Sequence, residues 1–159
     1  MKLNRIFLIS FIISSFLCFS QKQIIGKVVA ITDGDTFKLL TKDSTLIKVR
    51  VANIDCPERK QPFSKRAKQF TSEAVFGKKV ELEYLKKDRY GRFICNVFYN
   101  DSLNLSQELL KIGLAWHYVK YSKDESLQVL ENEAKENEVG LWQDPNSIPP
   151  WEWRSKKRN

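Results

Sequence analysis

Residues 23–51 read QIIGKVVAITDGDTFKLLTKDSTLIKVRV. Many of these residues are β-branched, and two polar groups, Asp33-Gly34 and Lys42-Asp43-Ser44, interrupt them with turn signals. Between residues 45 and 51, apolar and polar residues alternate, which is the pattern of a strand with one buried face. We therefore predict a meander of three strands over residues 24–31, 36–40 and 45–51.

Two further strands and three helices are expected downstream. Alternating residues predict strands over residues 80–85 and 92–99, separated by a polar turn. Each helix is expected between a capping residue and a glycine, and the three pairs are Ser64 and Gly77, Asn104 and Gly113, and Ser122 and Gly140. The predicted fold class is α+β, mainly β: a five-stranded OB-fold barrel with three helices, a frame often used for oligonucleotides. An α+β sandwich of the same elements is the alternative.

The first residues resemble an export signal. Lys2 and Arg5 precede an apolar run from Ile6 to Phe19, which is shorter than the ~20 residues of a spanning helix. We expect a signal peptide over residues 1–20, a folded domain over 21–154 and a basic tail over 155–159. After cleavage the protein would be exported to the periplasm or the medium, with no membrane attachment. An uncleaved or lipid anchor is the alternative.

The charge of the chain favours a polyanionic partner. Lys and Arg number 27 against 19 Asp and Glu, which gives a net charge of +8. Removing residues 1–20 takes away two positive charges, and the remaining +6 suits a polyanionic partner, with nucleic acid ahead of anionic surfaces. A charge that only aids solubility is an equal alternative. No amphipathic seam predicts an oligomer, so we expect a monomer without an obligate protein partner. Cys56 and Cys95 would remain, either as one disulfide or as two buried thiols.

Five charged residues have the chemistry that phosphodiester cleavage needs. Asp35 and Asp55 lie near strand ends and offer the carboxylate oxygens that hard divalent cations prefer. Arg50 and Arg92 offer planar guanidinium forks for a phosphate, and Glu58 can orient or deprotonate a water molecule. Each residue also has an ordinary structural explanation: Asp35 can satisfy a turn, Arg50 can face solvent, and Arg92 can pair with a nearby carboxylate.

The sequence gives little support for a zinc site or for a Ser-His-Asp catalytic triad. His117 is the only histidine of the chain, and the sequence contains no CxxC motif. We interpret His117, which lies between Trp116 and Tyr118, as a packing residue.

Three ordered motifs resemble the staphylococcal nuclease (thermonuclease) family. They are ITDGDT at residues 31–36, VRV leading to IDCPE across residues 49–58, and DRYGR at residues 88–92. The resemblance extends over residues 23–154, and three motifs in order are far more specific than one alone.

The resemblance implies a calcium-dependent nuclease that acts on DNA and RNA with little sequence preference and leaves 3′-phosphate ends. It implies Ca²⁺ binding by the carboxylates of Asp35 and Asp55 and by the backbone carbonyl of Cys56. By the same resemblance, the catalytic residues are Arg50, Glu58 and Arg92, and the residues at or near nucleotide contacts are Arg89, Tyr90 and Tyr121. The segment from Lys60 to Lys65 is shorter than the substrate loop of the best-known member.

Two other functions remain as alternatives. One is a non-catalytic OB-type nucleic-acid-binding module, although such degenerate domains usually lose the charged residues that are all present here. The other is an exported adhesion or structural domain with a cationic surface. Trp151 and Trp153 either dock the C-terminal tail onto the domain or extend a nucleic-acid surface.

Overall fold

The computed structural model of the protein describes residues 23–156. The predicted signal peptide, residues 1–20, lies outside these residues, as does the end of the predicted basic tail. The elements in chain order are β1 (Gln23–Ile31), β2 (Thr36–Thr41), β3 (Leu46–Val51), β4 (Ile54–Asp55), α1 (Ser64–Val75), β5 (Lys79–Lys87), β6 (Phe93–Tyr99), β7 (Leu103–Asn104), α2 (Leu105–Lys111), β8 (Trp116–His117), α3 (Glu125–Glu136), the 3₁₀ helix η1 (Gly140–Gln143) and α4 (Pro150–Lys156).

Five of the strands close into a barrel. The sheet order is β3-β2-β1-β5-β6-β7, and β3 also pairs in parallel with β6, with Val49 opposite Phe93. This parallel pairing joins the two sides of the sheet and leaves β1, β2, β3, β5 and β6 in one closed ring. The predicted five-stranded OB-fold barrel is therefore confirmed, and the open sandwich alternative is wrong.

The barrel interior follows the alternation in the sequence. In β3 the side chains of Ile47, Val49 and Val51 are buried, while the residues between them are more exposed. Phe37 and Leu39 from β2 are also fully buried in the same apolar core. Each such side chain contributes about 1.5–3 kcal/mol on burial, so the meander supplies much of the stabilisation of the barrel.

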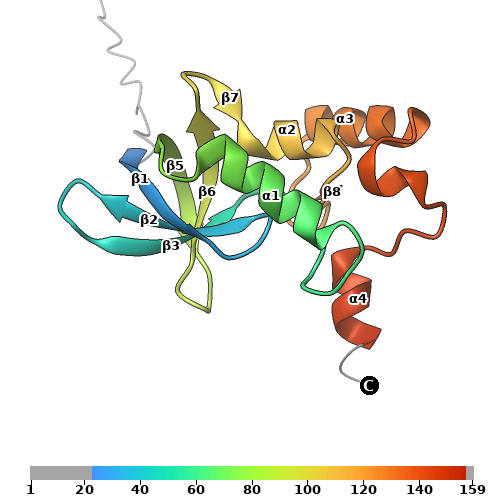
Figure 1. The fold of residues 1–159 in the computed structure, drawn as a ribbon, viewed down its shortest axis with the longest axis horizontal. Helices are drawn as coiled ribbons and strands as arrows, with labels where there is room; N and C mark the ends of the chain where they lie inside the picture. The colour runs from blue at the N-terminus through green and yellow to red at the C-terminus, as the bar shows by residue number, and fades with distance from the viewer. Residues whose placement is uncertain (1–22, 157–159) are drawn as a thin grey trace, which may run out of the picture.

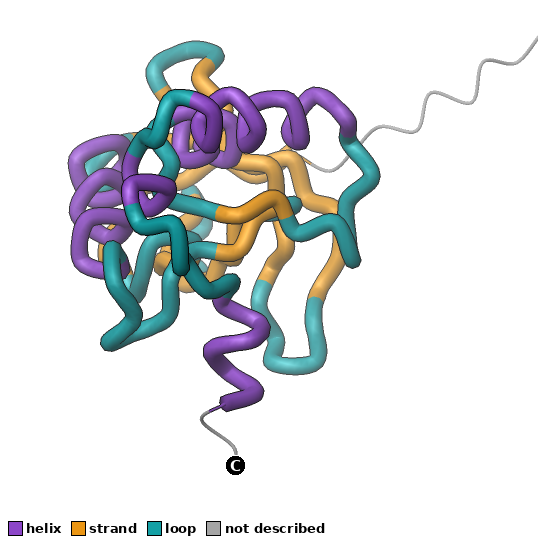
Figure 2. The backbone as a smooth tube through the Cα atoms, turned by 90° about the vertical axis from the view of Figure 1, so that its right-hand side faces the viewer, coloured by secondary structure: helices purple, strands orange, loops and turns teal. Residues whose placement is uncertain are grey.

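The helices surround the barrel at one end and across one side. Figure 1 shows α1 across the barrel, with α2 and α3 together beside it and α4 below them at the C-terminal end. Figure 2, turned by 90°, shows α4 apart from the other helices, beneath the strands. Among the described residues, no helix is long and apolar enough to cross a membrane.

Two of the three predicted helix caps are wrong. Helix α1 has no side-chain cap, because Phe63 takes the capping position in a left-handed conformation and Ser64 is already the first helical residue. Helix α3 begins at Glu125 with Asp124 as its cap, while the Ser122 hydroxyl lies 3.0 Å from a ring nitrogen of His117. The Asn104 cap is confirmed, since its side chain accepts from the backbone N–H groups of the next turn.

The end of the chain differs from the prediction. Helix α3 ends at Glu136, and Gly140 begins η1 instead of closing α3. The helix count is four rather than three within residues 23–156, because Pro150 starts the short helix α4. A proline at the first helical position is favourable, since its missing N–H has no partner there in any helix.

Candidate active site

Asp35, at the turn between β1 and β2, belongs to a buried cluster of bonded polar groups. Its Oδ2 accepts from the backbone N–H of Cys56 at 2.9 Å and from Arg50 Nη1 at 2.7 Å. Its Oδ1 accepts from the Thr36 hydroxyl at 2.9 Å. The carboxylate is buried, and these bonds connect the β1–β2 turn to the segment that follows β4.

Arg50, at the end of β3, bridges the two aspartates. Nη1 contacts Asp35, and Nη2 donates to Asp55 Oδ1 at 2.8 Å. The side chain is only 12% exposed, and burial alone would lower the pKa of Arg50. The charges of Asp35 and Asp55 outweigh burial and raise the pKa of Arg50, so the guanidinium is the fixed counter-ion of both carboxylates.

A second guanidinium reaches the same carboxylates from the C-terminal helix. Arg154 Nη2 donates to Asp55 Oδ2 at 2.7 Å, and Nη1 donates to Asp55 Oδ1 at 3.2 Å and to Glu58 Oε1 at 2.6 Å. The side chain of Asp55 is almost fully buried, whereas those of Glu58 and Arg154 are more than a third exposed. Arg154 thus connects Asp55 to Glu58, a contact that the sequence motifs did not indicate.

The cluster contains more acids than its cations balance. Burial and the neighbouring Asp35 carboxylate raise the pKa of Asp33 to about 7. Burial also raises the pKa of Asp55, and the hydrogen bond from Arg154 only partly offsets this effect. Oxygen-only donors with excess negative charge are what hard divalent cations require, so the residues present fit such a cation chemically. Within residues 23–156, however, no group of three or more His, Cys, Asp or Glu side chains is arranged as a metal site.

Arg92 bonds to a carboxylate outside this cluster. Its Nε donates to Asp88 Oδ2 at 2.7 Å, and its backbone N–H donates to the same side chain. The side chain is 24% exposed, and Asp88 also holds the turn by accepting from the backbone N–H of Tyr90. The guanidinium of Arg92 is therefore paired with a carboxylate, as the ordinary structural explanation expected, while remaining partly open to solvent.

The three predicted nucleotide-contact residues are exposed and lie close to other cations. Tyr90 is 69% exposed, and the guanidinium of Arg89 lies 4.9 Å from the centre of its ring. Tyr121 is also exposed, with the ammonium groups of Lys86 and Lys120 within 6 Å of its ring centre. Exposed aromatic rings beside cations suit base stacking together with phosphate attraction.

The two cysteines within the described residues are free and buried. Burial raises the pKa of the Cys56 thiol well above its usual range, and burial raises the pKa of Cys95 to about 12. The structure therefore favours two buried thiols over the disulfide that the sequence left open. The structure shows only the backbone N–H of Cys56 bonded to Asp35, so a metal-binding role for its carbonyl stays a prediction.

His117 is a packing residue, as expected. It is buried, and its two ring nitrogens lie 3.0 Å from Gln128 Oε1 and from Ser122 Oγ.

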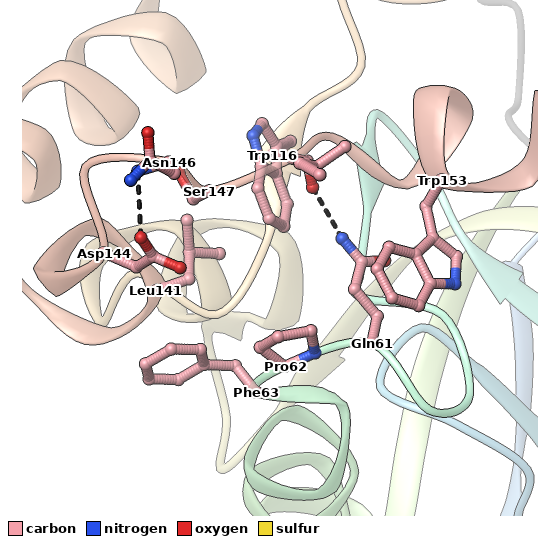
Figure 3. Close-up of a pocket in the computed structure, with 10 residues that line it drawn as sticks. Gln61, Pro62, Phe63, Trp116, Leu141, Asp144, Asn146, Ser147 and Trp153 are labelled. Atoms are coloured by element: carbon pink, nitrogen blue, oxygen red, sulfur yellow. Dashed lines mark hydrogen bonds between the residues drawn. The ribbon is translucent and has the colours of Figure 1, made fainter. Parts of the chain in front are cut away.

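A small apolar cavity lies where the C-terminal segment meets the loop before α1. Figure 3 shows Trp153 and Gln61 beside this cavity, together with Pro62, Phe63, Trp116 and Leu141. The volume is about 90 Å³. The Gln61 side chain accepts from the Glu58 backbone N–H and donates to the carbonyl of Ile148. Gln61 therefore fixes the Glu58 loop to the segment that leads into α4.

Comparisons with known proteins agree on one family. The family described as "Staphylococcal nuclease homologue" matches residues 48–144. An Escherichia coli protein named "Uncharacterized endonuclease" is 39% identical over 132 residues, covering 83% of this chain and 86% of its own. A Shigella flexneri "Micrococcal nuclease" is 37% identical over 144 residues, covering 84% and 82%. The Arabidopsis thaliana "Staphylococcal-like nuclease CAN1" is 41% identical over 111 residues, covering 70% of this chain and 34% of its own.

Proposed function

The chain belongs to the staphylococcal nuclease family and is a hydrolytic nuclease. We propose that its cofactor is Ca²⁺ and that its substrates are DNA and RNA. We further propose that it cleaves with little sequence preference and leaves 3′-phosphate ends. The observation that carries the proposal is the buried pairing of Asp35, Arg50 and Asp55 at one end of the barrel, with Glu58 connected to it through Arg154.

Asp35, Asp55 and the carbonyl of Cys56 are the residues that would hold the calcium ion. A bound Ca²⁺ supplies positive charge that neutralises the scissile phosphate and orients the attacking water. The two carboxylates already lie within contact distance of one guanidinium, so their oxygens converge on a single region. That convergence is a feature that a hard cation needs and that a surface ion pair does not require.

Glu58 and the two arginines have separate tasks. Glu58 is partly exposed, so a water molecule can reach its carboxylate, and it accepts the proton of that water or fixes its orientation. Arg50 is held in place and presents positive charge to the phosphate from the barrel end. Arg92 would exchange its bond to Asp88 for a bond to a phosphate oxygen, which its partial exposure permits.

Arg89, Tyr90 and Tyr121 would bind the nucleic acid on either side of the cleaved bond. Their exposed rings stack on bases of any identity, and neighbouring lysines attract the backbone. This mode of binding reads no base edges, which is consistent with low sequence preference.

We also propose that residues 1–20 direct export and are removed, and that the product is monomeric. The basis is the charged and apolar pattern of these residues in the sequence. N-terminal sequencing of the protein recovered outside the cytoplasm, with its mass by light scattering, tests both points. A product that retains residues 1–20 contradicts the export proposal, and a dimer contradicts the monomer.

Cleavage assays on the purified protein test the calcium and substrate proposals. Single-stranded DNA and RNA are incubated with Ca²⁺ and, in parallel, with a chelator, and the product ends are tested for removal of a 3′-phosphate. We expect digestion of both substrates only with Ca²⁺. The Arg92→Ala variant should lose at least about a hundredfold in turnover, whereas Lys42→Ala, which removes a charge from an exposed turn, should retain activity.

Different results discriminate between the proposals. Digestion that continues in chelator contradicts the calcium requirement. Salt-sensitive binding of nucleic acid without digestion supports the non-catalytic OB-type module instead. Full activity of Arg92→Ala contradicts the role of that arginine as a phosphate ligand.

A further inference from the structure

Arg154 belongs to a helix that no part of the proposed mechanism uses, yet it makes three bonds to the carboxylates of the site. It binds both oxygens of Asp55 and one oxygen of Glu58, at 2.6–3.2 Å. Two of these three bonds fall below 2.8 Å, in the range of strong charge-assisted hydrogen bonds.

Each carboxylate oxygen of Asp35 and Asp55 already accepts at least one hydrogen bond. Both oxygens of Asp35 accept bonds, from Thr36, Arg50 and the Cys56 backbone. Oδ1 of Asp55 accepts from Arg50 and Arg154, and Oδ2 accepts from Arg154. A divalent cation that binds Asp55 therefore competes with a guanidinium at whichever oxygen it approaches.

Arg154 is the guanidinium that is easier to displace. Its side chain is 36% exposed, against 12% for Arg50. Arg50 is also anchored to Asp35 and donates to the carbonyl of Ile54, so its departure would break bonds to three groups. Arg154 can rotate into solvent at the end of a helix, where a long cationic side chain is readily hydrated.

Contacts other than the bonds of Arg154 also position the helix that carries it. The ring of Trp151 stacks on Tyr118 with a centroid distance of 5.2 Å and an interplanar angle of 5°. Trp153 lines the cavity beside Gln61, whose side chain bonds to the backbone just before α4. Figure 3 shows Trp153 and Gln61 on the same side of this cavity. These contacts dock α4 beside the carboxylates, and the bonds of Arg154 add to the local stability of the helix.

We propose that Arg154 is a further functional residue of this site, an internal cation that competes with the divalent cation for Asp55 and Glu58. In the cation-free protein it balances their charge, and it leaves them when the cation binds. Arg154 therefore weakens cation affinity and adjusts the concentration at which the enzyme becomes loaded. This inference rests on the proposed calcium site, and its test separates the two.

The test is calcium binding measured by calorimetry on the full chain, without substrate. Arg154→Ala should bind Ca²⁺ about tenfold more tightly than the unmodified protein, because the cation no longer displaces a partly exposed ion pair. Arg154→Gln, which keeps a similar length without the charge, should do the same. The control Lys156→Ala removes one charge from the same helix at an exposed position, and its affinity should change less than twofold.

A second readout follows the helix itself. Hydrogen exchange of residues 150–156 should become faster on adding Ca²⁺ to the unmodified protein, since the bonds of Arg154 to the site are then broken. In Arg154→Ala the exchange of this segment should not respond to Ca²⁺. Circular dichroism verifies that both variants are folded, as expected because Arg50 still neutralises Asp55.

The outcomes are distinct. If the unmodified protein binds Ca²⁺ and Arg154→Ala binds it equally well or more weakly, the competition is wrong while the calcium site stands. If Asp55→Asn removes binding in both backgrounds, the calcium site is supported independently of Arg154. If no variant binds Ca²⁺, the proposed cofactor is wrong and the competition is overturned with it.

Discussion

Replacing Arg50 by alanine should destabilise the fold strongly, whereas replacing Arg92 should not. Both arginines have the same proposed role toward phosphate, but the structure gives them different environments. Arg50 is 12% exposed and bonded to two buried carboxylates, while Arg92 is 24% exposed and bonded to one carboxylate in a turn. Comparing the two variants therefore separates the effect of burial on stability from the chemical role of an arginine.

The magnitude follows from what remains in Arg50→Ala. Breaking a buried ion pair by removing one partner costs about 3–5 kcal/mol, because the other charge stays buried. Asp55 keeps the bonds from Arg154, but Asp35 keeps only the Thr36 hydroxyl and the Cys56 N–H. We expect a loss of about 3 kcal/mol, which for a domain of this size lowers the melting temperature by roughly 10 °C. For Arg92→Ala we expect about 0–1 kcal/mol, the range of exposed pairs.

The assay is urea unfolding followed by circular dichroism, in chelator so that no metal contributes. The midpoint should fall for Arg50→Ala with an unchanged slope, since the slope reports the surface exposed on unfolding. Arg50→Lys serves as the intermediate case, because an ammonium keeps the charge without the fork that spans both aspartates. Equal losses in Arg50→Ala and Arg92→Ala would refute the argument that Arg50 is the buried counter-ion of the cluster.

Three further predictions concern the core, one glycine and the thiols. Phe37→Ala should cost about 3–5 kcal/mol in urea unfolding, because the ring is fully buried in the barrel. Gly113→Ala should lower the free energy of unfolding by more than the roughly 1–2 kcal/mol that a left-handed conformation costs an alanine. The reason is that φ is +61° and that a Cβ would also lie 2.1 Å from the carbonyl oxygen of Val139. Cys56 and Cys95 should react with a thiol reagent at pH 8 only after unfolding, because burial raises both pKa values and keeps the thiols protonated at that pH. Rapid labelling of the folded protein at pH 8 would contradict the burial of these thiols.

The barrel was predictable because period-two alternation is a local signal. In β3 the apolar residues predicted to face inward are buried in the structure, and turn residues delimit the strand on both sides. No local pattern predicts the parallel pairing of β3 with β6, because it joins residues more than 40 positions apart. Closure was inferred from the order of elements, which matches one known architecture, and not from any local pattern.

The helix caps show where local patterns fail. Ser64, Ser122 and Asp124 all have side chains that can accept from a backbone N–H, so the sequence alone does not rank them. At α1 the left-handed Phe63 takes the cap position, and at α3 the nearer Asp124 takes it while Ser122 bonds to His117. Tertiary contacts decided both cases.

The site was predictable only as far as its motifs extend. Asp35, Arg50 and Asp55 lie within 21 residues of one another and meet as the motifs imply. Arg154 was missed because its partners lie 96 and 99 positions away and it stands in a basic run that resembles a solvated tail. The only hint was the pair of tryptophans beside it, which predicts docking but not what the docked helix contacts.

The buried polar cluster contributes little to the stability of the barrel, which indicates that it is present for function. Buried ion pairs can often be replaced by apolar residues of similar volume without loss, so a barrel end selected for stability alone has no need of Asp35, Arg50 and Asp55. Here four acidic side chains face two arginines, and this crowding shows at Asp33, whose pKa is raised to about 7 by burial and by the Asp35 carboxylate. Such an excess lowers stability in the isolated protein and raises affinity for an external cation or for positive charge from α4. In the cation-free protein, Arg154 neutralises part of that excess through its bonds to Asp55 and Glu58. A bound divalent cation would neutralise the same charge in its place.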